Sequence, residues 1–535
     1  HRRRIRRGRR AALARREGRE RPGSEQETEG RSHDAERWHA RRDALWKAAL
    51  SIKQGCLVLA ALLALLHFSR FDLRGAPIVT DVRYYVHFAP LVADGAVPHR
   101  DFFDNKTQLA TYAGAVMVRA GRVLGVEPLL AMRGGYLALS VLAALLVFAI
   151  QRRLYGGSCA AGLLGMLCYL GFSLLGFLPA IGPLPKLLMG ICAALAALLA
   201  YAGWWTTAGA LGAVAFLDWQ IGVLAGLGVL AAALCERGAR VRTALRTAAG
   251  GAAVLLASGV WFASHGALGV TWHQVVLTSL ARGETALAHK TFAERVLQIL
   301  ETVRVACPGH GWLAALGVVG MALFPLLAWR LRGTRAMRMV IALAVFHYGI
   351  VAFSLADYQA YGDLFALLAS LALFAGVALN ELWRLLTALV TRGADLAAAA
   401  RRRRTLAVGA VLLAVVALRV GRPRLDIELP DKIAKGATTL EQQRDVARQI
   451  ADATAGLGSV VFVNCPEQLF LTGRANPLPF GFWNRATYAY FKESAAERPY
   501  QTLARLLDTV HPDAVLCPTP RAENDLVRSG TFDRI

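Results

Sequence analysis

Long apolar stretches separated by short basic or polar segments recur through the middle of this chain. Stretches of about twenty apolar residues are long enough to cross the hydrocarbon core of a bilayer as helices. The pattern therefore predicts a polytopic α-helical membrane protein with about eleven transmembrane helices. These spans are expected at residues 47–69, 108–125, 134–151, 158–179, 184–204, 207–234, 243–264, 311–330, 339–356, 364–389 and 405–420.

Composition and charge agree with this class. Of the 535 residues, 55% are hydrophobic and only 18% are charged, which excludes a single soluble globule. The formal charge of +24 does not indicate a nucleic-acid binder, because much of the arginine lies between the apolar stretches. The basic segments 237–242, 330–335 and 401–404 fall on one side, together with residues 1–46, which we interpret as a disordered basic arm.

The positive-inside rule assigns that side to the cytoplasm. We therefore expect a multi-pass protein of the cell (inner) membrane with a cytoplasmic N-terminus and, because the number of spans is odd, an extracytoplasmic C-terminus. The segment 151–154 contains two arginines and would lie outside. Either a span is miscounted there, or the arginines bind an anionic group.

The chain after the last span, residues 421–535, is expected to form a small extracytoplasmic α/β domain, with the transmembrane domain at 47–420. Helical spacing over 439–455 is followed by a strand-like run at 459–463, and a second helix-strand pair ends at 514–516. Such alternation favours parallel strands. A Cys-Pro step follows each strand, so Cys465 and Cys517 either form a disulfide or remain two half-buried thiols.

Candidate chemistry gathers in the predicted external loop 70–107. A first group follows the first span, and a second group precedes the next apolar stretch. Acids and a lysine held beside aromatic rings at headgroup depth suit a substrate with a lipid tail and an anionic linker. A lone Asp81 would more often be a solvated loop acid, but the second group makes a site the better interpretation. The residues are Asp81, Arg83, Tyr84 and Tyr85, then Arg100, Asp101, Phe102, Phe103, Asp104 and Lys106.

Other polar residues are weaker candidates. Asp218 interrupts an apolar run, where a charge is costly, so it either pairs with a polar neighbour or faces substrate. The segment 471–477 is interpreted as a turn rather than a site. The external stretch 265–310 contains residues that could cover the first loop as a lid, namely Trp272, His273, Arg282, Glu284, His289 and Lys290.

The first loop resembles that of the GT-C superfamily of membrane glycosyltransferases that use polyprenyl-phosphate sugars, including the protein-mannosyltransferase-like (family 39-like) and aminoarabinose-transferase-like branches. An external acid, then tyrosine, then a Gly-x-x-Pro-Tyr-x-Asp-Phe-Phe-like stretch and a lysine correspond here to Asp81, Tyr84 or Tyr85, residues 95–103 and Lys106. Val82 stands where many relatives have a second acid, and 107–108 replaces a proline pair. The segment 357–363 differs from a His-Tyr pair that relatives often have.

The resemblance implies an inverting glycosyltransferase that moves a sugar from a polyprenyl-phosphate donor to an acceptor hydroxyl. Asp81 would be the catalytic base, and Lys106 would pair with the lipid phosphate, helped by Arg83 or Arg100. Asp101 and Asp104 would orient the sugar, hold Lys106 or bind a divalent cation, with orientation favoured and no metal ligand assigned. Tyr84 and Tyr85 would contact substrate.

Two other classes stay open at this stage. Intramembrane acids would suit a transporter or flippase of lipid-linked sugar, although the two halves of the chain show no repeat. A non-catalytic envelope protein would need fewer spans than this chain offers. For the enzyme, the expected partners are the lipid-linked donor, membrane lipids and an acceptor that is a protein, lipid or polysaccharide, with no nucleic acid.

Overall fold

The computed structural model describes residues 54–278, 280, 291–307, 309–358, 361–391, 400, 407, 409–417, 439–483, 485–494 and 496–516. Contacts divide the chain into two compact units, residues 1–59 and 60–535. The second unit contains the elements that form the site. The predicted basic arm and Cys517 lie outside the described residues, as do 405, 406, 408 and 418–420 of the predicted span 405–420.

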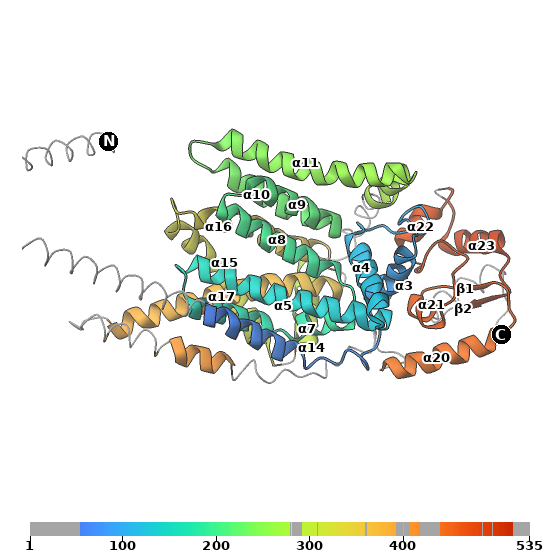
Figure 1. Ribbon diagram of the computed structural model, residues 1–535, viewed down its shortest axis with the longest axis horizontal. Helices are drawn as coiled ribbons and strands as arrows, with labels where there is room; N and C mark the ends of the chain where they lie inside the picture. Colours follow the sequence, from blue (N-terminus) through green and yellow to red (C-terminus); the bar gives the residue numbers. More distant parts are fainter. Residues whose placement is uncertain are drawn as a thin grey trace, which may run out of the picture. The chain divides into compact units, whose positions relative to one another are not determined.

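A bundle of long apolar helices makes up most of the second unit (Figure 1). Within the described residues, six helices are long and apolar enough to cross a membrane, or seven if the bent pair α6 (Cys159–Leu170) and α7 (Ser173–Ile181) is one span. The polytopic helical membrane class is thus confirmed, while the count of eleven stays a prediction. The six are α5 (Pro128–Leu154), α8 (Pro185–Ala202), α11 (Arg240–Ser264), α15 (Gly311–Arg330), α16 (Ala336–Ala356) and α17 (Tyr361–Thr391).

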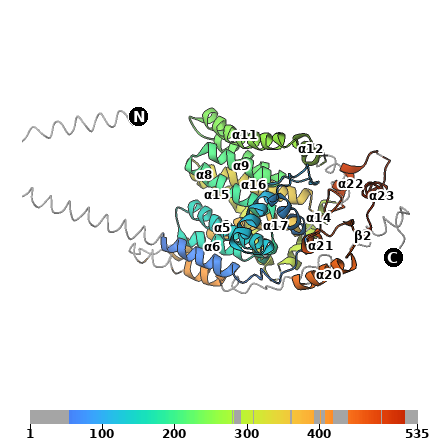
Figure 2. The same cartoon turned by 45° about the vertical axis from the view of Figure 1, so that its right-hand side comes forward.

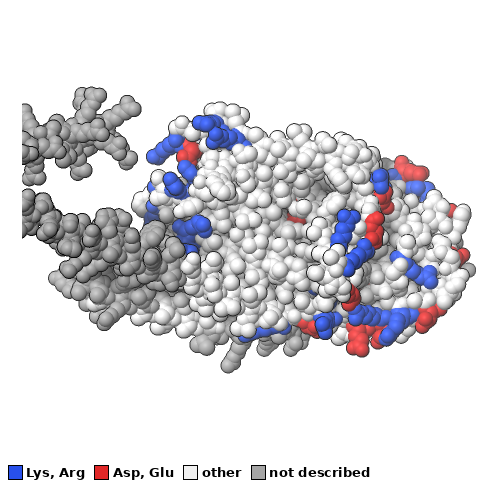
Figure 3. Space-filling view, in the orientation of Figure 1, with Lys and Arg blue, Asp and Glu red and all other residues white. Residues whose placement is uncertain are grey.

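Burial distinguishes central from peripheral helices. In the most apolar stretch of α17, 83% of the residues are buried, so this helix lies in the core. Only 17% are buried in α11, which leaves apolar side chains such as Leu256 and Val260 exposed, as suits contact with lipid. Figure 3 shows a broad surface almost without charged side chains between a basic end and a mixed charged zone.

The predicted single span at 207–234 is wrong. This run forms two short helices, α9 (Trp205–Asp218) and α10 (Val223–Leu234), joined by a 3-10 turn at Gln220–Gly222. The helices pack closely through Gly212 and Gly226, since a Cβ on Gly212 would lie 2.6 Å from the Gly226 Cα. The polar break after Asp218 permits this hairpin, because Trp219 adopts an extended backbone that ends α9.

The predicted span at 108–125 is also not among the membrane-length helices. It forms α4 (Leu109–Leu124), which packs along α3 (Val82–Ala93). The Arg119 Nε donates to the Ala93 carbonyl at 2.9 Å, and Arg122 pairs with Asp94 beyond the end of α3. These contacts explain the position of α4, because both arginines pair with groups at the end of α3.

The end of α5 also resolves the awkward segment 151–154. The Tyr155 hydroxyl donates to Glu381 at 3.0 Å, and Glu381 pairs with Arg330 from one of the basic segments. Residues 151–154 therefore lie at the same end of the bundle as Arg330. This favours a miscounted span over an anion site.

The C-terminal segment, residues 439–516, combines helices with two short strands (Figures 1 and 2). β1 and β2 pair in parallel, with Val461 opposite Val515, as the sequence predicts. That residues 421–535 form a domain of their own stays a prediction, as does the disulfide of buried Cys465 with Cys517. The elements are α20 (Leu440–Ala453), β1 (Val460–Phe462), α21 (Pro466–Thr472), α22 (Arg485–Phe491), α23 (Pro499–Val510) and β2 (Ala514–Leu516).

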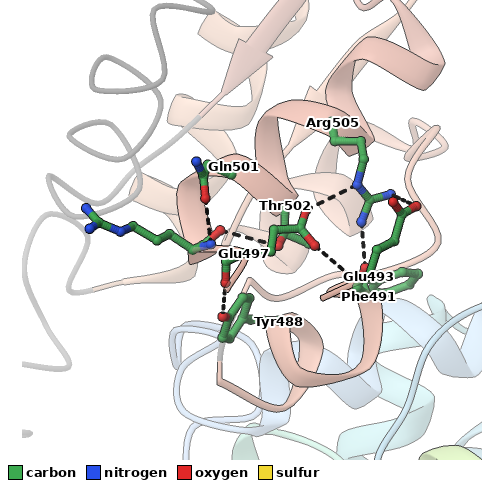
Figure 4. Close-up of polar contacts among 8 residues, drawn as sticks. Tyr488, Phe491, Glu493, Glu497, Gln501, Thr502 and Arg505 are labelled. Atoms are coloured by element: carbon green, nitrogen blue, oxygen red, sulfur yellow. Dashed lines mark hydrogen bonds and ion pairs between the residues drawn. The ribbon is translucent and has the colours of Figure 1, made fainter. Parts of the chain in front are cut away.

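A polar network ties α22 to α23 (Figure 4). The Arg505 guanidinium on α23 pairs with Glu493 at 2.9 Å and Glu497 at 3.2 Å, and it donates to the Phe491 carbonyl at 2.7 Å. The Tyr488 hydroxyl donates to the Glu497 carbonyl. Several charge-assisted bonds to one guanidinium fix its orientation, so α22 is held against α23.

The first loop is fastened on two sides. Buried Arg133 of α5 donates to three loop and helix-end carbonyls, those of Leu73 (2.8 Å), Ala76 (2.7 Å) and Ile181 (3.1 Å). From the other side, the Gln443 side chain of α20 makes two hydrogen bonds to the Ile78 backbone, at 2.7 and 2.9 Å. The N–H donors of a guanidinium group have a fixed planar geometry. Arg133 therefore fixes the position at which the loop leaves the bundle.

Phe103 joins the first loop to the C-terminal segment. Its side chain is 4% exposed and belongs to the apolar cluster of Val461, Leu478 and Leu503. Its amide donates to the Pro479 carbonyl at 2.6 Å. The residue just before Asp104 is thus part of the core of the C-terminal segment, which fixes the position of the acid.

Candidate active site

Asp81 precedes the first turn of α3 and lies on a tight backbone turn. Thr80 has φ of +58°, a left-handed conformation that a β-branched residue rarely adopts. Residues in this region carry ~1–3 kcal/mol of strain and cluster at functional sites. The Asp81 carboxylate makes no cap hydrogen bond to α3. It is therefore free to reach across to the loop that precedes α4.

Asp81 and Lys106 form an ion pair, with 3.1 Å between Oδ2 and Nζ. Their side chains remain 49% and 29% exposed, so both are accessible from the surface. The Lys106 ammonium holds the pKa of the Asp81 carboxyl well below its usual range against the opposing effect of partial burial, and Lys186 and Arg83 act in the same direction. Partial burial alone would lower the pKa of Lys106, but the charges of Asp81 and Asp104 raise it. Both groups are thus ionised at neutral pH.

Asp104 lies behind this pair and is 1% exposed. Its carboxylate accepts hydrogen bonds from the Lys106 amide at 2.9 Å and the Gln108 side chain at 2.7 Å. Burial raises the pKa of Asp104 to about 6, although these donors and the Lys106 charge oppose the shift. Asp104 therefore holds the lysine loop and titrates near neutrality.

A histidine and a glutamine set the loop between Pro98 and Asp104. The Gln274 Oε1 accepts from the Asp104 amide at 3.0 Å, and its Nε2 donates to the His99 carbonyl at 3.1 Å. The His99 Nδ1 lies 3.0 Å from both the Asp104 carbonyl and the Gln274 Oε1, so it is the protonated nitrogen. Burial lowers the pKa of His99 to about 4, which keeps the ring neutral.

Asp81, Asp104 and Lys106 line a cavity of about 220 Å³ that is open on one side. Typical small-molecule pockets are about 300–1,000 Å³, so this space suits one small polar group. The start of α3, the loop before α4 and the C-terminal segment each supply a wall. The lining residues are Thr80, Asp81, Arg83, Tyr84, Phe103, Asp104, Asn105, Lys106, Phe480, Gly481, Phe482 and Thr487.

A second ion pair lies next to Asp81. The Lys186 Nζ at the start of α8 is 2.8 Å from the Asp363 carboxylate and 4.6 Å from the centre of the Trp219 ring. A Cβ on Gly362 would lie 3.0 Å from this Nζ and 3.4 Å from the Asp81 Oδ2, so the two side chains flank the glycine. Lys186 also lines a narrow apolar cavity of about 60 Å³ between α5, α8, α16 and α17. It thus lies where the charged groups meet the apolar interior.

Most of the predicted site residues meet at this cavity. Arg83 lines it, with a guanidinium nitrogen 3.6 Å from Glu467. The Tyr84 hydroxyl donates to the Phe103 carbonyl at 2.7 Å, and the buried Tyr85 ring lies 5.8 Å from the Lys106 Nζ. Burial raises the pKa of both tyrosines well above the usual range, so they are neutral.

Two predicted residues lie elsewhere. Arg100 and Asp101 pair with each other at 2.7 Å and do not line the cavity. The Asp101 Oδ2 accepts from the Val97 amide at 2.7 Å, which closes a turn. A substrate-binding role for either residue stays a prediction. Among the described residues, no group of three or more His, Cys, Asp and Glu side chains could hold a metal ion.

Asp218 and the predicted lid give a mixed outcome. The Asp218 Oδ2 accepts from the Met189 amide at 2.7 Å, so this acid binds the first turns of α8 and lines neither cavity. Trp272 is exposed, and the His273 ring lies 5.1 Å from that of Tyr490. Gln274, which the sequence did not single out, contacts the loop instead. Arg282, Glu284, His289 and Lys290 lie outside the described residues.

Sequence reasoning missed the second ion pair and the C-terminal wall. Lys186 had a visible signal, because it stands second in an apolar helix after Pro185, where a lysine is otherwise costly. Asp363 precedes a long apolar run in the same way. Phe480 and Phe482 had no such signal in the sequence, because aromatic residues in a polar C-terminal segment are expected to lie in the apolar core of that segment.

No family model matches the sequence, and no curated protein sequence matches it. Several solved structures are similar. One is the crystal structure of ArnT from Cupriavidus metallidurans bound to undecaprenyl phosphate. The match covers 81% of this chain and 87% of the ArnT chain, with 17% sequence identity and a TM-score of 0.52. The match to the oligosaccharyltransferase of Archaeoglobus fulgidus covers 79% of this chain and 64% of the oligosaccharyltransferase chain, with 14% sequence identity and a TM-score of 0.46.

The similarity to ArnT covers most of both chains, and at 17% identity it concerns the fold alone. This chain therefore shares its overall fold with the ArnT structure.

Proposed function

We propose that this protein is an inverting glycosyltransferase that moves a sugar from a polyprenyl phosphate to an acceptor hydroxyl. The observation that carries this proposal is the Asp81–Lys106 pair, 3.1 Å apart at the edge of a small open cavity. The ArnT structure of similar fold contains undecaprenyl phosphate, a lipid of the proposed donor class. Two ion pairs lie next to each other at Gly362, Asp81 with Lys106 and Asp363 with Lys186. This arrangement suits a reaction in which a carboxylate accepts a proton while an ammonium group stabilises the negative charge that develops on a phosphate.

In the proposed reaction the acceptor oxygen attacks the anomeric carbon, and its proton passes to the Asp81 carboxylate. The bond between that carbon and the phosphate oxygen breaks, and polyprenyl phosphate leaves with the electron pair. Lys106 neutralises the oxygen as its charge develops. One displacement inverts the anomeric centre.

The ion pair bears on the strength of the base. With Lys106 at 3.1 Å, the low pKa of Asp81 makes it a weak proton acceptor. A donor phosphate that binds Lys106 would share that ammonium and raise the pKa of Asp81. Donor binding would thereby activate the base only when substrate is present. Lys186, which lies between Asp81 and the apolar cavity, would meet the phosphate from the membrane side.

Sugar release from radiolabelled polyprenyl-phosphate sugars in proteoliposomes tests the proposal. Asp81→Asn is expected to lower kcat by about 10²- to 10⁴-fold, the usual contribution of a general base. Asp508→Asn is the matched control, because Asp508 is exposed on α23 and does not line the cavity. Unchanged release in Asp81→Asn would refute the base assignment. Movement of the lipid across the bilayer without sugar release would favour a flippase.

A further inference from the structure

The C-terminal segment supplies the wall of the cavity that faces Asp81 and Lys106, through residues 480–482 and Thr487. We propose that Phe482, together with Tyr84, forms the subsite that receives the sugar ring of the lipid-linked donor, so that the C-terminal segment selects the sugar. This inference rests on the proposed glycosyltransferase function and assigns its sugar specificity.

The Tyr84 and Phe482 rings are stacked on each other, and both line the cavity as one aromatic surface. Their centroids are 5.9 Å apart, and their planes differ by 19°. The Arg83 guanidinium lies 5.1 Å from the Phe482 ring centroid and pairs with Glu467 from α21. The cation stabilises the ring position through its contact with the π face. The aromatic surface is thus held in place before any ligand arrives.

The chemistry of the cavity matches a sugar. A sugar ring has faces of C–H groups, which bury well against aromatic carbon, and an edge of hydroxyl groups, which require hydrogen bonds. Here the aromatic surface is bordered by Asp81, Lys106 and Arg83, which can accept from or donate to hydroxyls. The volume of about 220 Å³ is below the roughly 300–1,000 Å³ of typical small-molecule pockets, so the cavity suits a single small unit rather than a longer glycan.

The backbone that carries Phe482 is pinned to β1. The Asn476 side chain donates to the Phe480 carbonyl at 2.8 Å and exchanges two hydrogen bonds, both 3.1 Å, with the Phe462 backbone. The Asn464 side chain accepts from the Trp483 amide at 2.7 Å. Both ends of the short run 480–483 are therefore fixed. Binding of a ligand then costs little conformational entropy for ordering this run.

Two further bonds hold the wall, one to the lysine loop and one within the C-terminal segment. The Phe103 amide donates to the Pro479 carbonyl at 2.6 Å, and the Thr487 hydroxyl donates to the Phe482 carbonyl at 2.7 Å. Thr487 lies in the first turn of α22, which the Arg505 network holds (Figure 4). The wall thus keeps its distance from the lysine loop.

The test compares two ligands in binding, polyprenyl phosphate carrying a hexose and the same lipid phosphate without sugar. Dissociation constants are measured on the full-length protein in nanodiscs, for wild type, Phe482→Leu and Phe482→Tyr. An exposed phenylalanine on α14 (Phe292–Ala306), Phe292, gives the matched control Phe292→Leu, since its side chain is 65% exposed. Sugar release is recorded in parallel. If the wild-type protein releases no sugar, the proposed transferase function fails, and this outcome is distinct from a failure of the subsite proposal.

We expect Phe482→Leu to weaken binding of the sugar-carrying lipid about ten-fold and to leave the sugar-free lipid within two-fold, because only the sugar loses an aromatic face. Phe482→Tyr should restore most of the affinity. Equal weakening of both lipids would show that Phe482 only supports the fold and would overturn the inference. Unchanged binding of both would overturn it as well.

Discussion

The replacement of Lys106 by methionine is the sharpest test of the proposed chemistry. It removes the ammonium 3.1 Å from the Asp81 carboxylate and keeps most of the side-chain length. Two unit charges at that distance attract by about 5 kcal/mol at an effective dielectric constant near 20 and by about 1 kcal/mol in water. Because both side chains are partly exposed, solvent screens the pair, so the ground-state contribution lies toward the lower value.

The effect on catalysis should be larger than on stability. A departing phosphate gains charge in the transition state, and loss of one preorganised donor to such a charge typically costs about 10²- to 10³-fold in kcat. We therefore expect Lys106→Met to lower kcat by that factor while the protein remains folded. Lys106→Arg should recover only part of the rate, because a planar guanidinium does not take the place of a compact ammonium.

The assay is single-turnover release of labelled sugar at saturating donor, which separates chemistry from binding. Lys492→Met is the control, since Lys492 is exposed on the C-terminal segment and outside the cavity. Removal of the ammonium also lets the pKa of Asp81 rise toward its ordinary value, so an acid limb should move up into the measurable range. Wild-type kcat in Lys106→Met would contradict the proposed role of the lysine.

Three further predictions address the surroundings of this pair. Because burial raises the pKa of Asp104 to about 6, kcat/KM should fall as pH drops through that value and the acid takes up a proton; Asp104→Asn should abolish this limb, and a profile identical to wild type would exclude Asp104 as its source. Phe103→Ala should destabilise the joint between loop and C-terminal segment by ~3–5 kcal/mol, seen as faster limited proteolysis and a lower Tm; wild-type resistance would count against the joint. Gly362→Ala should lower kcat at least several-fold with little change in Tm, because its Cβ would crowd Lys186 and Asp81, whereas Gly134→Ala has open space and should behave as wild type.

The sequence was sufficient for the parts of the site that are local. Asp81 and Lys106 are only 25 residues apart in the sequence, so they could be grouped with Asp104 as one predicted site, although α3 separates Asp81 from the lysine loop. The apolar pattern likewise predicted most membrane helices, but it did not reveal that 205–234 is a hairpin. Hydrophobicity continues through the break, and only the polar Asp218 and Gln220 mark it.

The remainder depended on tertiary packing. Lys186 and Asp363 are 177 residues apart and meet only because α8 and α17 begin at the same end of the bundle. Phe482 reaches the cavity because β1 and two asparagine side chains fix its loop. No periodicity or local motif encodes such a meeting, since a buried aromatic residue in a core has the same sequence signature.

The bond between Gln443 and Ile78 joins residues 365 positions apart, and Phe103 is buried among side chains that are translated equally late. At synthesis rates of 5–20 residues per second, the first loop waits roughly 20 to 70 s for the segment that completes its cavity. A nascent or prematurely terminated chain would thus hold the acid and the lysine without the wall opposite them. Under the proposed function, only chains translated beyond Thr487 contain every residue that lines the cavity.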